Sequence, residues 1–237
     1  MKPPIPNNEA RRLDALLRYR ILDTAAEQMF DDIALVASAI CDTPIALMSL
    51  VDSERQWFKA RVGLDTTDTP REQAFCAHAI LGDDTLIVED ATADVRFADN
   101  PLVTSAPHIR FYAGAPLIDR DGHALGSLCV IDRKPRQLTD EQKAALAALA
   151  RSVIRHIELR QASAELALAM EELKAVRALL PICSHCKSVK NDDGYWQQVE
   201  EYISSHTAAD MSHGICPGCM KKHHPGLYKK LRAEGKL

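Results

Sequence analysis

The chain has 237 residues, of which 46% are hydrophobic and 26% charged, and its formal net charge is −4. This length is enough for one full domain and a smaller second one. No apolar run approaches the ~20 residues that cross a bilayer, and the first residues, MKPPIPNNEARR, lack the apolar stretch of a secretory signal. We therefore expect a cytoplasmic protein without a membrane span.

Two helices are predicted near the start of the chain, over residues 7–20 and 26–41, because apolar residues recur there at helical spacing. The segments 44–52 and 56–63 are short apolar runs set between turn residues, which is typical of strands. A tight DSER turn separates them, so the sequence predicts a hairpin.

The segment 69–82 begins with Thr-Pro and ends in Gly, which are helix start and stop signals, and it is predicted to be helical. A short strand is expected over 85–90, followed by the irregular DVRFADNPLV. The segments 110–119 and 124–132 are predicted strands, joined by RDGH with its Asp-Gly turn signal. The first 138 residues therefore indicate an α+β domain, a mainly antiparallel sheet with helices packed on it.

A long helix is predicted from Thr139 to Leu180, because no Gly or Pro occurs between Thr139 and Pro181. Its second half carries a heptad repeat of apolar residues: Leu159, Ala162, Leu166, Ala169, Leu173, Val176 and Leu180. We expect this stripe to pair with a second copy of the chain through residues 159–180, giving a homodimer. The alternative is a single amphipathic helix that folds back on the sheet.

Four of the seven cysteines form two CxxC pairs, separated by 29 residues: Cys183, Cys186, Cys216 and Cys219. Zinc takes four ligands in a tetrahedron, and each CxxC turn can supply two thiolates. The pattern predicts one structural zinc ion per chain in a treble-clef-like fold. A redox-switched or iron–sulfur site is the alternative, and His185 or His213 could replace a cysteine as ligand.

The last segment, 181–237, contains eight Lys/Arg and six Asp/Glu, so it is slightly basic. A zinc fold with a basic tail could contact nucleic acid. However, this charge is small and no array of basic and aromatic residues accompanies it, so nucleic-acid binding is not expected.

The motifs RFYAGAPL, LGSLCVID and PRQLTDEQ follow one another before the long helix, and FCAHAI, DATADVRFADNPLV and WFKARVGL precede them. In this order the sequence resembles a GAF domain, a small-molecule sensory module of bacterial signalling proteins, over about residues 20–160. EARRLDALLRYRILDT is similar to the leader before such domains in sensor kinases and cyclases. The cysteine-rich end is similar to that of some bacterial response-regulator and sensor proteins.

The resemblance implies a ligand cavity on one face of the sheet. Its expected lining residues come from FCAHAI, from the irregular segment and from RFYAGAPL: Phe75, Cys76, His78, Phe97, Arg110 and Tyr112. Each of them could equally be a packing residue, and Arg110 could instead pair with Asp94 or Asp99. Bilin-binding relatives carry adjacent Cys-His, whereas Ala77 follows Cys76 here, so no covalent chromophore is expected.

We expect four parts: a helical leader (1–22), a GAF-like domain (23–158), a signalling helix (139–180) and a zinc module (181–237). No P-loop, nucleophile elbow or cyclase signature occurs in the sequence. The prediction is therefore a sensor or dimerisation module without enzymatic output, which passes its signal to a protein partner through the coiled coil and zinc module. The alternatives are a thiol or redox switch, or a redox enzyme, using Cys76 or the CxxC pairs, and a zinc protein that binds nucleic acid.

Overall fold

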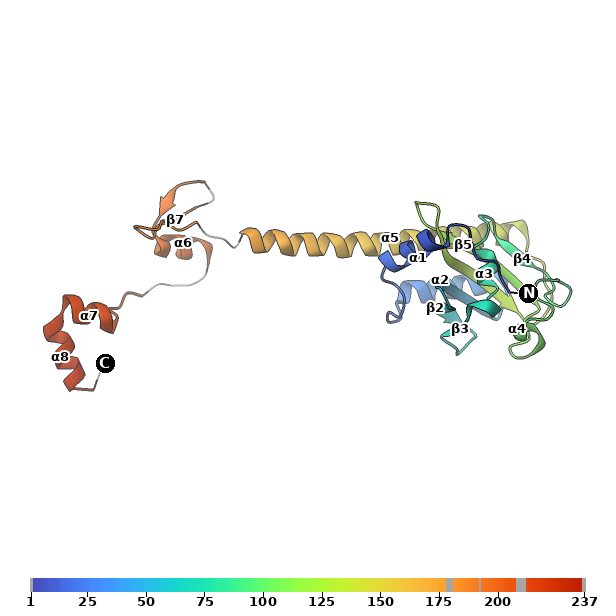
Figure 1. The fold of residues 1–237 in the computed structure, drawn as a ribbon, viewed down its shortest axis with the longest axis horizontal. Helices are drawn as coiled ribbons and strands as arrows, with labels where there is room; N and C mark the ends of the chain where they lie inside the picture. Colours follow the sequence, from blue (N-terminus) through green and yellow to red (C-terminus); the bar gives the residue numbers. More distant parts are fainter. Residues whose placement is uncertain (1, 178–180, 192, 208–211, 236–237) are drawn as a thin grey trace. The chain divides into compact units, whose positions relative to one another are not determined.

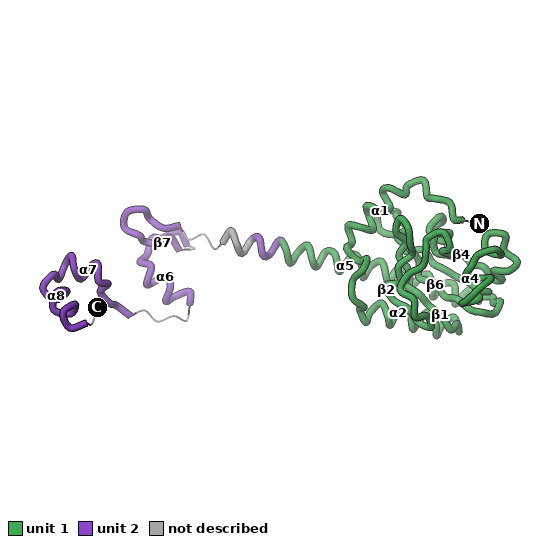
Figure 2. The backbone as a smooth tube through the Cα atoms, turned by 60° about the horizontal axis from the view of Figure 1, so that its bottom comes forward, with its two compact units in different colours: residues 1–168 green, residues 169–237 purple. Residues whose placement is uncertain are grey.

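The computed structural model describes residues 2–177, 181–191, 193–207 and 212–235. The chain forms two compact units, residues 1–168 and 169–237 (Figure 2). Within the described residues, no helix combines the length and the apolar character that a membrane span requires.

The first unit contains a six-stranded antiparallel sheet in the order β3-β2-β1-β6-β5-β4. Figure 1 shows this sheet with helices packed around it. Its strands are β1 (Ile45–Val51), β2 (Arg55–Val62), β3 (Asp68–Pro70), β4 (Leu86–Val88), β5 (Phe111–Ile118) and β6 (Ala124–Asp132). Its helices are α1 (Glu9–Arg18), α2 (Gln28–Cys41), α3 (Cys76–Ala79), α4 (Pro101–Thr104) and the long α5 (Asp140–Arg177), which extends into the second unit. The predicted α+β fold is confirmed.

Both faces of the sheet are covered. All residues of the central strands β1 and β6 are buried, although successive side chains point to opposite faces. Helices α1, α2 and α5 pack on one face, where Met48 and Leu128 belong to the same core as Phe30 and Leu146. The other face carries a second core, which includes α3 and residues of the segment 88–109.

The predicted helix over 69–82 is wrong. Residues 68–70 form β3, residues 71–73 a 3-10 turn, and only Cys76–Ala79 is α-helical. Strand β3 pairs with β2 through Gln56 and Thr69, whose side chains are also joined by a hydrogen bond of 2.6 Å. Pairing with β2 at the edge of the sheet therefore outweighs the local Thr-Pro start signal.

The leader packs within the first unit. Ala15, Leu16 and Ile21 are fully buried in the same core as α2 and α5. At the start of α5, the amide of Gln142 donates to Thr139 Oγ1 at 3.3 Å and the amide of Thr139 donates to Gln142 Oε1 at 3.0 Å. This reciprocal cap explains why the helix begins at the predicted position.

Helix α5 presents Leu159 and Leu166 to solvent, with 66% and 62% of their surfaces exposed. Their exposure is compatible with the predicted heptad stripe, and coiled-coil pairing remains a prediction. The side chains of Leu173 and Val176, and all of Leu180, lie outside the described residues.

The described part of the second unit contains a two-stranded ribbon, β7 (Val189–Lys190) and β8 (Trp196–Gln197). Three short helices follow: α6 (Val199–His206), α7 (Pro217–His223) and α8 (Pro225–Ala233).

Candidate functional site

The predicted ligand-contacting residues come together on the face of the sheet that carries α3. The rings of Phe75 and Phe97 are stacked with centroids 4.0 Å apart, and Tyr112 lies 5.2 Å from Phe75. The His78 ring meets Phe97 edge-on at 4.8 Å. Phe75, Phe97 and Tyr112 are at most 2% exposed. In this conformation the aromatic side chains fill the space between α3 and β5, and ligand binding by this group remains a prediction.

Two thiols and a phenol lie together beneath these rings. Cys76 on α3 and Cys129 on β6 have sulfur atoms 3.8 Å apart. The Tyr112 hydroxyl donates to Cys76 Sγ at 3.5 Å and lies 3.2 Å from Ser127 Oγ. Gly114 makes room for this hydroxyl, because a Cβ there would lie only 2.1 Å from the Tyr112 oxygen. A glycine two residues further along the strand therefore positions the phenol.

Within this buried cluster, the pKa values of Tyr112, Cys129 and Cys76 are shifted in different directions. Burial raises the pKa of Tyr112 well above its usual value. The hydrogen bond with Cys76, together with burial, raises the pKa of Cys129 well above that of a free thiol. At Cys76 burial opposes ionisation, but the hydrogen bonds from Cys129 and Ser127 outweigh it and lower the pKa. Cys76 is therefore the more acidic of the two sulfurs.

Arg110, directly before β5, binds backbone carbonyl groups. Its Nη1 atom donates to the carbonyl oxygens of Val103 at 2.9 Å and of Ile109 at 3.0 Å. The alternative pairing with Asp94 is not formed, since the Asp94 carboxylate is bound by Arg96. Arg110 therefore anchors α4 to the start of β5 through carbonyl groups, which a sequence does not reveal as partners.

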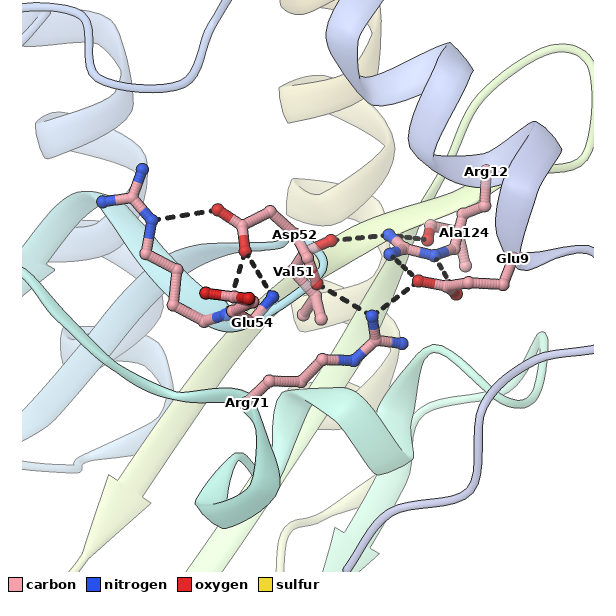
Figure 3. Close-up of polar contacts among 8 residues, drawn as sticks. Glu9, Arg12, Val51, Asp52, Glu54, Arg71 and Ala124 are labelled. Carbon is pink, nitrogen blue, oxygen red and sulfur yellow. Dashed lines mark hydrogen bonds and ion pairs between the residues drawn. The ribbon is translucent and has the colours of Figure 1, made fainter.

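A second polar cluster, which sequence analysis missed, joins the leader to the sheet (Figure 3). The guanidinium of Arg12 is fully buried and donates to Glu9 and, at 2.7 Å, to the carbonyl of Val51. Arg71 Nη1 donates to the same Glu9 carboxylate at 2.5 Å and to the carbonyl of Asp52 at 2.8 Å. Glu9 thus bridges two arginines from distant parts of the chain.

The four paired cysteines lie in the second unit and are Cys183, Cys186, Cys216 and Cys219. Hydrogen bonds with Ser188 lower the pKa of Cys186 to about 7. The amide of Cys219 donates to Cys216 Sγ and lowers the pKa of that thiol. Both thiols therefore have local donors that favour the thiolate, which is the form that binds metals.

The two pairs are not gathered into one site here. In the part of the chain that the structure describes, one group of three or more metal-ligating residues is close enough to share an ion, namely Asp119, Asp121 and His123. Zinc binding by the paired cysteines therefore remains a prediction.

A curated relative bears on the predicted function. Over 156 residues, which are 65% of this chain, the sequence is 48% identical to a cyclic di-GMP phosphodiesterase of Pseudomonas aeruginosa. The match spans 27% of that protein. This finding contradicts the prediction of a signalling protein without catalytic output, and likewise the prediction that the protein is not an enzyme.

Solved structures and a family profile complete the comparison. The GAF domain of an Acinetobacter phosphoenolpyruvate-protein phosphotransferase covers 66% of this chain and 96% of its own, with 16% identity and a TM-score of 0.49. A free methionine-R-sulfoxide reductase of Neisseria meningitidis covers 69% and 98%, with 18% identity and a TM-score of 0.48. The profile of the GAF domain family matches residues 20–157, and the chain belongs to that family.

Proposed function

We propose that residues 20–157 form the signal-sensing GAF domain of a protein that takes part in cyclic di-GMP turnover. The observation that carries this proposal is the 48% identity to a relative that is named for hydrolysis of cyclic di-GMP. The matched segment is about a quarter of that relative, so the proposal assigns regulation, and not the hydrolytic step, to this domain.

The sensing face in this proposal is the α3 side of the sheet. Among the six residues predicted to contact a ligand, the side chains of His78 and Arg110 are partly exposed, whereas the others are buried. A ligand would therefore first meet His78 and Arg110, and further entry would require the stacked rings of Phe75 and Phe97 to separate.

A domain exchange tests the proposal. The matched segment of the Pseudomonas relative is replaced by the corresponding segment of this chain, and cyclic di-GMP hydrolysis is measured. We expect hydrolysis close to that of the intact relative. The full-length chain is assayed in parallel for hydrolysis of its own.

The matched control is the same chimera with Phe97→Ala, which removes a fully buried ring and should cost about 3–5 kcal/mol of domain stability. If the domain regulates hydrolysis, the rate of cyclic di-GMP hydrolysis by this variant should no longer match that of the intact relative. A folded chimera with the same activity as a relative from which the segment has been deleted contradicts the proposal.

We also propose that two chains pair through α5. The helix has 38 residues and is thus about 57 Å long. Leu159 and Leu166, seven residues apart, are exposed on it, and a second copy would cover them.

The test is the double variant Leu159→Lys/Leu166→Lys, which places like charges inside such a pair. Sedimentation should show a wild-type dimer and a monomeric variant, whereas the matched control Ala164→Lys, outside the stripe, should stay dimeric. A wild-type monomer at tens of micromolar contradicts the pairing.

A further inference from the structure

The described part of residues 181–237 has almost no interior. Only Ser188 and Val189 are buried there, although the segment contains a ribbon and three helices. Several large apolar side chains face solvent instead: Ile182, Tyr195, Trp196, Ile215 and Leu227. Modules of this size without an apolar core need another source of stability, such as a disulfide or a metal ion.

The first cysteine pair lies in a turn that is closed by backbone hydrogen bonds. The backbone amide of Lys187 donates to the carbonyl of Cys183 at 3.0 Å. The backbone amide of Cys183 donates to the carbonyl of Ser188 at 2.8 Å. Lys187 has a φ of 64°, a left-handed conformation that reverses the chain directly after Cys186. The Ser188 hydroxyl lies 3.3 Å from Cys186 Sγ. The turn thus supplies polar partners to a sulfur that would carry negative charge as a ligand.

The second pair has a different backbone and the same spacing. Cys216 precedes α7, and Pro217 is the first residue of that helix. The amide of Cys219 donates to Cys216 Sγ at 3.4 Å, and the amide of Met220 donates to the Cys216 carbonyl at 2.9 Å. The start of the helix therefore gives Cys216 Sγ a backbone donor and places Cys219 three residues later, in the first turn of the helix.

We propose that the four paired cysteines bind one Zn²⁺ ion and that this binding folds residues 181–237 into a packed module. Four thiols give up four protons as the ion takes four sulfur ligands in a tetrahedron, so no oxidant or reductant is needed. Each pair would supply two of the four sulfur ligands. Zinc would join the two pairs and bring the exposed apolar side chains against one another. This inference is independent of the proposed role of the GAF domain.

Trp196 reports on this folding. The chain contains two tryptophans, Trp57 in the first unit and Trp196 in the second, so Trp57→Phe leaves Trp196 as the single indole. Trp196 is 55% exposed here and should emit as a solvated indole when metal is absent. The full-length Trp57→Phe protein is purified under reducing conditions, stripped of metal with a chelator and titrated with Zn²⁺.

We expect the Trp196 emission to shift to shorter wavelength and to saturate at one Zn²⁺ per chain. Trypsin resistance of residues 181–237 should rise in the same range of zinc concentration, because most of its lysines lie in elements that the module would order. Co²⁺ in place of Zn²⁺ should give the visible absorption of a tetrahedral thiolate site.

Cys183→Ser and Cys219→Ser should each abolish the shift, whereas the matched control Ser184→Ala, in the same turn, should keep it. His185→Ala and His213→Ala should also keep it, which separates four sulfur ligands from a mixed site. The proposal is overturned if zinc is retained when all four cysteines are serine. It is equally overturned if the emission of Trp196 remains that of a solvated indole at saturating zinc. A third contrary result is a reduced protein whose trypsin resistance does not change with zinc and rises only when disulfide bonds form.

Discussion

The sulfur atoms of Cys76 and Cys129 lie 3.8 Å apart in the interior and connect helix α3 to the central strand β6. A disulfide bond would require about 2.05 Å, so these are two thiols in contact. Both residues are at most 2% exposed. The hydrogen bonds that make Cys76 the more acidic thiol are thus formed where a dissolved reagent does not reach.

The rates at which the cysteines are labelled should therefore depend on their burial and not on their pKa values. In native, metal-free protein, we expect iodoacetamide to modify Cys186 and Cys219 at least ten times faster than Cys76 or Cys129, because modification of the latter two requires local unfolding. Mass spectrometry of tryptic peptides over time measures each rate. All four should react alike in denaturant. Equal native rates for Cys76 and Cys186 would show that the α3 side of the sheet opens readily to solvent.

Arg110→Ala should lower the stability of the ligand-free protein. The substitution removes the donor to the Val103 and Ile109 carbonyls, and a charged hydrogen bond of this kind contributes about 1.5–3 kcal/mol. Thermal melting measures the loss, and Arg110→Lys should recover part of it because one ammonium can still reach a carbonyl. An unchanged melting temperature for Arg110→Ala would instead leave the side chain available for a ligand.

Strands and long helices were predictable because their signals are local. The Asp-Gly turn between β5 and β6 and the apolar runs on either side of it define the hairpin without outside information. Thr139 likewise marks the start of α5 because its capping partner, Gln142, is only three residues away.

The contacts that position the candidate site were not predictable in the same way. Residue Thr69 carries a helix signal, and its true state depends on pairing with Gln56 on another strand. An arginine in a helix, such as Arg12, is normally exposed to solvent. Arg12 is fully buried because its guanidinium binds the carbonyl of Val51, 39 positions further along the chain. Partners at such separations, and backbone carbonyls above all, leave no pattern in a single sequence.

Glu9 should contribute stability that depends on pH. Burial alone would raise the pKa of this carboxyl, but the hydrogen bonds and charges of Arg12 and Arg71 outweigh it and lower the pKa to about 2. In the unfolded chain the value returns to about 4.5. Since the unfolded state then takes up the proton first, the stabilisation is complete above about pH 5 and is lost as the pH falls towards 2.

The variant Glu9→Gln removes the charge between two arginines while keeping the size of the side chain. Leaving the buried Arg12 without its counter-ion should cost about 2–3 kcal/mol at pH 7. Urea unfolding at several pH values measures this difference, which should shrink steadily between pH 5 and pH 2.5, because the wild type loses the same contribution. The matched control Glu54→Gln, an exposed carboxyl near the same cluster, should change stability by less than about 0.5 kcal/mol. A difference between Glu9→Gln and wild type that stays constant with pH would mean that shape, and not the ion pair with Arg12 and Arg71, accounts for the effect.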